Sequence, residues 1–557
     1  MSNRFLRVFL SRALLAPVFC LSLSIFAAAQ QGGALDPSFG GGDGRVISAM
    51  GGAFQADDIA VQIIEGQTKI VAVGYRNTGK HNDFAVLRFN EDGSPDTSFG
   101  AMGFVAIDFS AGKFQSSEQA TSVVIQPDNK IVVVGTGLSF EDFIDRISVA
   151  RLNPDGSLDD SFGGGDGKVV TVVREESEAH AATIQADGKI VVAGTSKGTG
   201  FDYRFVVVRY LSNGMPDPDF GTNGSVVTQI EGASYNVAFA VAAQSDNKII
   251  AAGSSGNDFA VVRYEEDGDL DTAFDQDGIV KTNFRTAPNS YDAARAIALQ
   301  PSDGKIVVAG YAQVDKDVNW AVARYNPNGS LDNGFSQDGK DIPIEYDEVF
   351  EEYISIPGEI SDVVIQMDGK IVVGGEPGAF SPPVFKLTRY NVNGTQDATF
   401  GAEGVVKFNF EKGSTDVLKS LTLQPDGKIL AGGSSAPASM PEEAGAAGKN
   451  QIGSGDALAL ARLLPYAVSA AGVSVGGRVS SPGGQGLSKV SVTIFGGALP
   501  QPVTVQTNAF GYYNFEGIPA GETYVLTVGS KRYVFAQPSR ILNVSDAVTD
   551  ADFVSVE

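Results

Sequence analysis

The stretch Leu35–Gly40, "LDPSFG", decides the fold because close copies of it return along the chain. They read "SPDTSFG", "SLDDSFG", "MPDPDFG", "DLDTAFD", "SLDNGFS" and "TQDATFG". A second phrase of the type "GKIVVAG" recurs in step, with its lysines at Lys69, Lys130, Lys189, Lys248, Lys305, Lys370 and Lys428. Successive copies lie about 60 residues apart, and self-similarity at such a period indicates a solenoid, a propeller or another repeat array.

Each repeat unit is predicted to form four short strands. In the first unit we expect them at Gly44–Ala49, Asp57–Ile64, Lys69–Tyr75 and Phe84–Phe89. Val, Ile and Phe dominate these segments, and Gly, Asn, Asp and Pro punctuate them, as is typical of strands joined by tight turns. The last two segments are apolar at most positions, which favours sheets covered on both faces.

The order of the phrases predicts a closed ring. "LDPSFG" precedes the first "GKIVVAG"-type phrase, whereas the last such unit ends at Leu463 with no copy of "LDPSFG" after it. An N-terminal strand that completes the seventh sheet explains this arrangement and removes an open edge. We therefore predict an all-β chain: a seven-bladed β-propeller over residues 35–465, closed by an N-terminal strand. An open superhelical array is the alternative.

The period and the phrases resemble the delta-60 repeat, a bacterial family named for its repeat length. The resemblance covers the whole repeat region. It implies an exported, β-propeller-like protein and no defined activity.

Three recurring side chains are predicted to be structural. The recurring Phe is expected to fill the space between neighbouring blades, and the recurring Asp to pair with the Arg of a third repeated phrase ("FAVLRF" in the first unit), in its own or the next blade. The aromatic positions are Phe39, Phe99, Phe162, Phe220, Phe274, Phe335 and Phe400. The acidic positions are Asp36, Asp96, Asp159, Asp217, Asp271, Asp332 and Asp397. The basic positions are Arg88, Arg151, Arg209, Arg263, Arg324, Arg389 and Arg462.

No catalytic, cofactor-binding or metal-binding residue is predicted. Stretches such as Asn153–Asp159, "NPDGSLD", resemble half of a calcium loop, but an Arg stands two residues before them, so tight Asx turns are expected and calcium stays an open alternative. The two histidines, His81 and His180, occupy non-equivalent positions, which disfavours zinc. The acidic run Glu345–Tyr353 breaks the repeat and is the first suspect for a functional loop.

The N-terminus predicts export. Arg4, Arg7 and Arg12 precede a short apolar run, and Ala27–Ala29 offers a small-residue cleavage site, so residues 1–31 are expected to be a signal peptide. We expect a secreted, periplasmic or cell-surface protein with no transmembrane segment in the mature chain. The formal charge of −25 disfavours nucleic acid as a partner.

The C-terminal part of the sequence has a different pattern from the repeats. Residues 433–456 are expected to be a flexible insertion in the last blade. From residue 472 to 557, phrases such as "TNAFGYYNFEGIPAGETYVLTV" predict a small β-sandwich and resemble the carboxypeptidase regulatory-like, transthyretin-like domain. That resemblance implies a non-catalytic accessory module.

These observations favour an exported, non-enzymatic binding or scaffold protein that engages glycan or protein at the cell surface. The alternative is a polysaccharide-acting hydrolase or lyase with paired carboxylates at the propeller channel mouth. Two non-repeated acids that converge there would favour the enzyme.

Overall fold

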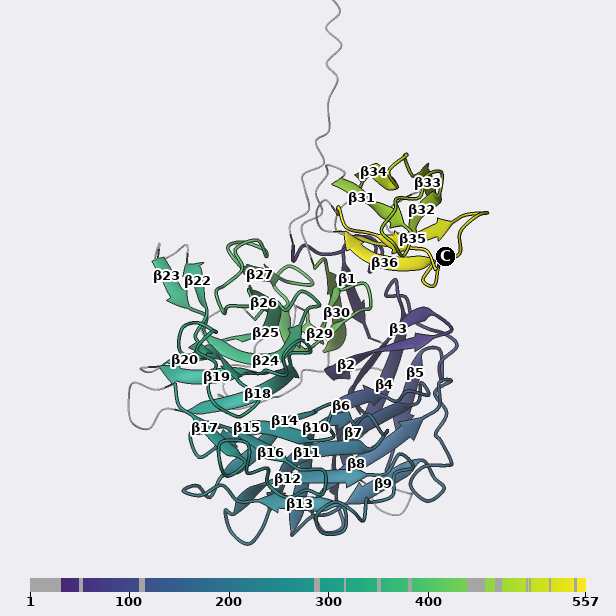
Figure 1. The fold of residues 1–557 in the computed structure, drawn as a ribbon. Coiled ribbons are helices and arrows are strands. Elements are labelled where there is room, and N and C mark those ends of the chain that lie inside the picture. Colours follow the sequence, from purple (N-terminus) through teal and green to yellow (C-terminus); the bar gives the residue numbers. More distant parts are fainter. Residues whose placement is uncertain are drawn as a thin grey trace, which may run out of the picture.

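The computed structural model describes residues 32–49, 54–109, 116–284, 291–314, 317–347, 352–378, 383–437, 456–465, 473–496, 499, 502–519, 522–544 and 548–556. Strands and turns make up these residues, and seven four-stranded antiparallel sheets form a ring (Figure 1). A smaller unit of two sheets follows the ring. The predicted all-β fold, a seven-bladed propeller with a small β-sandwich behind it, is confirmed.

Six blades take their strands in chain order, from the innermost to the outermost. Blade 1 holds β2 (Phe54–Ile64), β3 (Gln67–Asn77), β4 (Asn82–Asn90) and β5 (Phe104–Ile107). Blade 2 holds β6 (Ser116–Ile125), β7 (Ile131–Ser139), β8 (Asp145–Leu152) and β9 (Lys168–Thr171). Blade 3 holds β10 (Glu176–Ile184), β11 (Ile190–Lys197), β12 (Tyr203–Tyr210) and β13 (Ser225–Thr228).

Blade 4 holds β14 (Asn236–Ala243), β15 (Ile249–Ser255), β16 (Asp258–Tyr264) and β17 (Ile279–Thr282). Blade 5 holds β18 (Asp292–Leu299), β19 (Ile306–Val314), β20 (Asp317–Tyr325) and β21 (Lys340–Asp341). A hairpin of β22 (Ile344–Asp347) and β23 (Glu352–Ser355) separates it from the next blade. Blade 6 holds β24 (Gly358–Ile365), β25 (Ile371–Pro377), β26 (Phe385–Tyr390) and β27 (Val405–Phe408).

Blade 7 closes the ring with strands from both ends of the repeat region. Its order is β28 (Thr415–Leu423), β29 (Ile429–Ala436), β30 (Ala457–Leu463) and β1 (Arg45–Ser48). Arg45 faces Ala461 and Ser48 faces Leu458 in this antiparallel pairing. The blades are therefore offset by one strand from the sequence units, because "LDPSFG" lies in the loop that leads into the fourth strand of a blade.

A belt of repeated side chains joins each blade to the next. In every blade the Arg near the end of the third strand lies 2.6–2.8 Å from the Asp of the following loop. The same guanidinium lies 4.4–4.8 Å from the ring of the recurring Phe. The repeat lysine reaches that Asp at 2.7–3.5 Å. The Arg–Asp pair belongs to one blade, which decides between the two pairings left open above.

The arginines of the belt also cross the seam between blades. Each donates a hydrogen bond from Nη1 to a backbone carbonyl of the next blade, and Arg462 of blade 7 donates to Glu91 of blade 1. The other acceptors are the carbonyls of Pro154, Ser212, Glu266, Pro327, Val392 and Pro465. The belt therefore runs around the whole ring without a break.

The recurring Phe packs in the seam, as its repeat position suggests. Phe99 of blade 1 shares a buried cluster with Val71 of its own blade and with Val133 of blade 2. Gly214 has φ +85°, and a Cβ there would lie 2.7 Å from the Phe162 ring of the preceding blade. Glycine in that turn is thus required by both the backbone conformation and the close approach.

The C-terminal unit is a two-sheet sandwich. One sheet has the order β34 (Tyr512–Ile518), β31 (Val473–Ser480) and β37 (Phe553–Val554). The other has the order β33 (Val503–Gln506), β32 (Ser491–Gly496), β35 (Glu522–Gly529) and β36 (Ser539–Val544). Its core includes Val475, Val492, Phe515 and Leu526, all buried.

Several predicted segments lie outside the described residues. They include the expected signal peptide at 1–31 and positions 438–455 of the expected insertion. Within the described part of the chain, no helix has the length and apolarity needed to cross a membrane.

Arg263→Met is expected to lower the free energy of unfolding by about 3 kcal/mol, because it leaves the buried Asp271 carboxylate without its guanidinium, which lies 2.6 Å away. The matched control is Arg146→Met, which removes a solvent-exposed pair with Asp142 and should have a much smaller effect on stability. Urea denaturation of both variants measures the difference. Equal costs would contradict a buried, structural belt.

Candidate functional site at the channel

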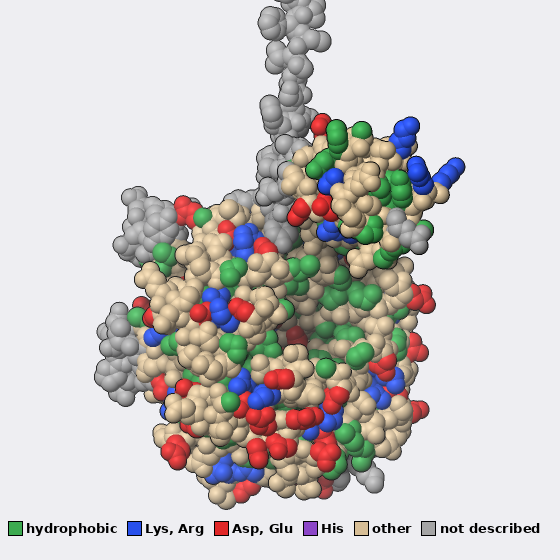
Figure 2. Space-filling model, in the orientation of Figure 1, with side chains coloured by type: hydrophobic (Ala, Val, Ile, Leu, Met, Phe, Trp, Pro, Cys, Tyr) green, Lys and Arg blue, Asp and Glu red, His purple; other side chains and the backbone are tan. Residues whose placement is uncertain are grey.

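The innermost strands carry one β-bulge each, at the same place in every blade. A bulge inserts an unpaired residue and re-aims its side chain, and bulges are common beside functional sites. The seven bulged residues are Asp57, Thr121, His180, Phe239, Arg295, Ser361 and Lys419. All seven are half-buried and lie on the strands that surround the central channel. We call them the channel ring. Figure 2 shows the molecule hollowed near the middle of the propeller.

One side of the channel ring is charged. Gln119 donates a hydrogen bond to Asp57 at 3.1 Å, and Lys419 pairs with Glu376 at 2.5 Å. Burial raises the pKa of Asp57 to about 6, although the Gln119 hydrogen bond and the Lys419 charge act against this rise. Asp57 therefore changes charge close to neutral pH.

The opposite side of the channel ring is a stack of rings and charge. The His180 and Phe239 rings lie 5.3 Å apart, and the Arg295 guanidinium lies 4.1 Å from the Phe239 ring. Arg295 also donates to Glu359 at 3.1 Å. Burial, followed by the Arg295 charge, lowers the pKa of His180 to about 4, so its imidazole is neutral at pH 7.

The residue after the bulge joins neighbouring inner strands in part of the ring. Asp58 accepts a hydrogen bond from the backbone N–H of Val123 at 2.8 Å, and Asp362 accepts one from Leu421 at 2.7 Å. Ser122 accepts from Ala182, and Ser420 accepts from Ile59. We call these four side chains the latches. They connect blades 6, 7, 1, 2 and 3 in turn. The equivalent residues of blades 3, 4 and 5 are Ala181, Ala240 and Ala296.

Two latch carboxylates approach the same hydroxyl. Ser420 Oγ lies 2.7 Å from Asp58 Oδ1 and 3.3 Å from Asp362 Oδ2. Burial raises the pKa of both carboxyls, and that of Asp362 reaches about 7 with Asp58 as a neighbouring charge. Each carboxylate also accepts hydrogen bonds from two backbone N–H groups. These acids converge, but their oxygens are used to hold strands together.

A cavity of about 700 Å³ opens beside the channel ring between blades 4 and 5. Its lining includes Phe239 and Arg295 of the channel ring, together with Tyr235, Tyr291 and Tyr311. Tyr235 and Tyr291 are more than half exposed, at 51% and 57%. The cavity uses loops that enter the innermost strands and loops that join second to third strands. We call the end of the propeller that carries these loops the variable face.

The predicted repeat residues lie at the other end of the propeller. All 21 belong to the belt, which is built from the ends of third strands and the loops that follow them. The turns between first and second strands share this end. Met367 in such a turn lies 3.7 Å from Asn543 of the sandwich. Sequence reasoning missed the channel ring. The sequence did hold one signal for it. In five blades the residue nine positions before the repeat lysine belongs to the channel ring, and its side-chain type differs from copy to copy.

The acidic run Glu345–Tyr353 lies away from the channel. Its described residues form part of the β22–β23 hairpin, which Figure 1 shows at the outer rim of the propeller. Glu345 is buried and contacts Lys386 at 3.0 Å and Lys407 at 2.7 Å. Positions 348–351 are outside the described residues. Among the described residues, this run contributes an ion pair network that supports the hairpin.

The Asp-Gly stretches form turns closed by their own side chains. Asp155 Oδ1 accepts hydrogen bonds from the Ser157 N–H at 2.9 Å and from its hydroxyl at 2.7 Å. Asp92 and Ser94 make the same contacts at 2.9 and 2.6 Å. These carboxylate oxygens therefore serve the Asx turns.

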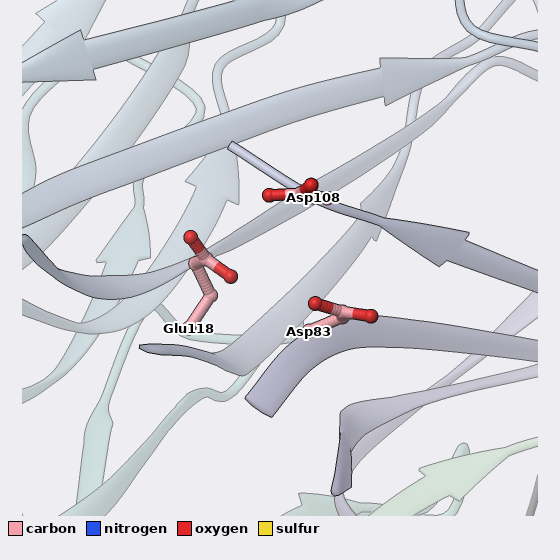
Figure 3. A group of neighbouring side chains, drawn as sticks. All are labelled: Asp83, Asp108 and Glu118. Atoms are coloured by element: carbon pink, nitrogen blue, oxygen red, sulfur yellow. The ribbon is translucent and has the colours of Figure 1, made fainter. Parts of the chain in front are cut away.

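Three other carboxylates, two from blade 1 and one from blade 2, lie close together. The ligand atoms of Asp83, Asp108 and Glu118 lie within 4.8 Å of one another (Figure 3). Arg76 Nη2 and His81 Nε2 each lie 3.2 Å from an oxygen of Asp83. Basic groups thus already face this acidic group.

The geometry and the repeats define the class: the chain is a β-propeller repeat protein. Six segments match the family model described as a domain of unknown function (DUF5122) beta-propeller, at residues 69–99, 126–162, 185–220, 244–274, 302–335 and 366–400. Each matched segment lies within one of blades 1 to 6. Blade 7 is split between the two ends of the repeat region, so its strands do not follow one another in the sequence.

Solved structures with similarity to the chain include several different proteins. Virginiamycin B lyase from Staphylococcus aureus gives a TM-score of 0.39 at 10% identity, covering 75% of this chain and 98% of that one. YCF48 bound to D1 peptide gives 0.37 at 10% identity, covering 78% and 99%. Sqt1 from Chaetomium thermophilum gives 0.36 at 10% identity, covering 68% and 94%. No curated protein matches the chain.

Asp362→Asn is expected to remove a pH dependence of stability. The pKa of this group is raised to about 7 in the folded state, so the folded chain binds its proton more tightly than the unfolded chain does. Its contribution to stability is therefore greatest below about pH 4 and declines as the pH rises to about 7. The free energy of unfolding of the variant should exceed that of the wild type by on the order of 1 kcal/mol at pH 8, and by less at pH 5.

Asp96→Asn is the control with the opposite sign. Burial raises the pKa of Asp96, but hydrogen bonds from Ser98 and Lys69 and the Arg88 charge lower it to about 2. This substitution should destabilise the chain throughout pH 5–8, and only acid below about pH 4 should reduce the difference. Thermal unfolding across this range tests both variants. If Asp362→Asn changed the free energy of unfolding by the same amount at every pH, the raised pKa of Asp362 would be contradicted.

Proposed function

We propose that this chain is an exported, non-enzymatic binding or scaffold protein whose ligand is a glycan or a protein outside the cytoplasm. The ligand binds on the variable face, at the mouth of the channel. One observation carries the proposal: the bulged residue occupies the same place in seven blades, yet it is Asp, Thr, His, Phe, Arg, Ser or Lys. The belt positions, whose side chains hold the blades together, instead keep one residue type in all seven copies.

The alternative function, glycoside cleavage by paired carboxylates, draws on Asp58 and Asp362. Such an enzyme needs one carboxyl to protonate the leaving group and another to activate water or attack the sugar. Both acids instead accept backbone hydrogen bonds from a neighbouring blade at 2.7–2.8 Å. Their engagement in the wall of the channel favours binding over catalysis.

Export is supported by the first 31 residues, where three arginines precede an apolar run and an Ala-Ala-Ala stretch. We further propose that the repeats are delta-60 repeats, on the strength of their shared phrases. By the same kind of resemblance, we propose that the C-terminal sandwich is a carboxypeptidase regulatory-like accessory module.

The purified chain is expected to bind a carbohydrate or a surface protein without converting it. It would be tested on a glycan array and against a panel of soluble polysaccharides, with and without calcium, while reducing ends are measured. Binding with no release of reducing ends is the expected result. Release of reducing ends that disappears in both Asp58→Asn and Asp362→Asn would replace this proposal with the hydrolase.

A further inference from the structure

The cavity between blades 4 and 5 has an unusual lining for its size. At about 700 Å³ it lies within the range of small-molecule sites, about 300–1,000 Å³. Such sites are commonly lined by both aliphatic and aromatic side chains. The described residues that line this one include four aromatic side chains and no Val, Leu, Ile or Met. Apolar contact here is therefore made through flat rings.

Flat rings suit a particular kind of ligand. Tyrosine offers a broad apolar face and a polar hydroxyl, and it is most useful where a ligand is apolar on one side and wet on the other. A pyranose ring has that character, since its C–H groups form an apolar face while its hydroxyls point outward. Tyr235 and Tyr291 present half-exposed rings at the cavity, and Tyr235 is supported by the Tyr203 ring at 5.1 Å.

Three of the four charged side chains in the described lining form ion pairs, and the fourth, Asp292, is buried and accepts hydrogen bonds from two backbone N–H groups. Lys281 lies 3.8 Å from Asp258, and Arg295 lies 3.1 Å from Glu359. The Arg295 guanidinium is also held between the rings of Phe239 and Tyr311, at 4.1 and 5.5 Å. The chain as a whole carries a charge of −25. A ligand rich in carboxylate or sulfate would meet compensated cations and a repulsive field, so a neutral ligand fits better.

From these features we infer that the cavity is a binding subsite for a neutral oligosaccharide. The inference rests on the proposed binding function and makes its ligand class specific. The rings of Tyr235 and Tyr291 stack on sugar faces. A proline-rich peptide is the competing ligand, because it also docks on aromatic side chains.

The test uses the full chain on an array of neutral gluco-, manno- and N-acetylglucosamine oligosaccharides. Uronate-bearing and sulfated glycans and proline-rich peptides stand beside them. Isothermal titration with the best neutral oligosaccharide then compares the wild type with a Tyr235→Ala/Tyr291→Ala double variant. We expect at least a tenfold loss of affinity in the variant. Added 0.5 M NaCl should leave wild-type affinity within twofold, because neutral ligands are not screened.

Phe201→Ala is the matched control, since Phe201 is an aromatic side chain on the variable face, 85% exposed, in blade 3. It should leave affinity within twofold.

The remaining outcomes separate this inference from the proposed function. Neutral glycan binding that survives the double tyrosine variant would overturn the subsite while the binding function stands. Binding of only anionic glycans or peptides would overturn the ligand class and again leave the function standing. Failure of every probe would overturn this inference, and the proposed function would then depend on a protein ligand alone.

Discussion

The whole ring depends on one arginine per blade. Its guanidinium satisfies a buried aspartate of its own blade at 2.6–2.8 Å, lies against a phenylalanine in the seam, and donates to a carbonyl of the next blade. Each bond relies on the others, because a buried charge is tolerated only when it is paired and fully hydrogen-bonded. The fold thus repeats a costly interaction seven times and obtains a closed circle whose blades cannot slide past one another without breaking it.

The propeller has two different ends, because the belt lies at one end and the variable face lies at the other. At the belt end the seven copies of Arg, Asp and Phe are the same, since any change would expose an unpaired charge or open a seam. At the bulged position of the inner strand, seven copies of one backbone geometry carry seven different side chains. The seven copies within one chain thus contrast the belt positions, which keep one side chain, with the bulged position, at which the side chain differs in every blade.

Much of the architecture follows from the repeated phrases, because a strand-entry turn such as Leu35–Gly40 has a local signature and a fixed period. The split of blade 7 was readable from a missing copy of that phrase. The channel ring was missed, although a variable position recurs nine residues before the repeat lysine in five blades. A bulge at Asp57 or Lys419 depends on how the first and second strands of a blade pair, which the local sequence does not specify. The role of Glu345 could not be predicted for a related reason. An acidic insertion indicates a loop, but the burial of Glu345 against Lys386 and Lys407 depends on the folded hairpin and the neighbouring blade.

The latches and the cavity occupy different parts of the channel wall. Blade 7 is the one blade built from two distant parts of the chain, so the hydrogen-bonded pairing of β1 with β30, and not continuous chain, closes the ring. Asp362, Ser420, Asp58 and Ser122 place polar bonds on the four consecutive seams from blade 6 through to blade 3. Blades 3, 4 and 5 carry alanine at the same position, and a cavity lies between blades 4 and 5. A ligand site on that side of the ring can therefore be shaped by Tyr235, Arg295 and Tyr291 without weakening the seam that closes the propeller.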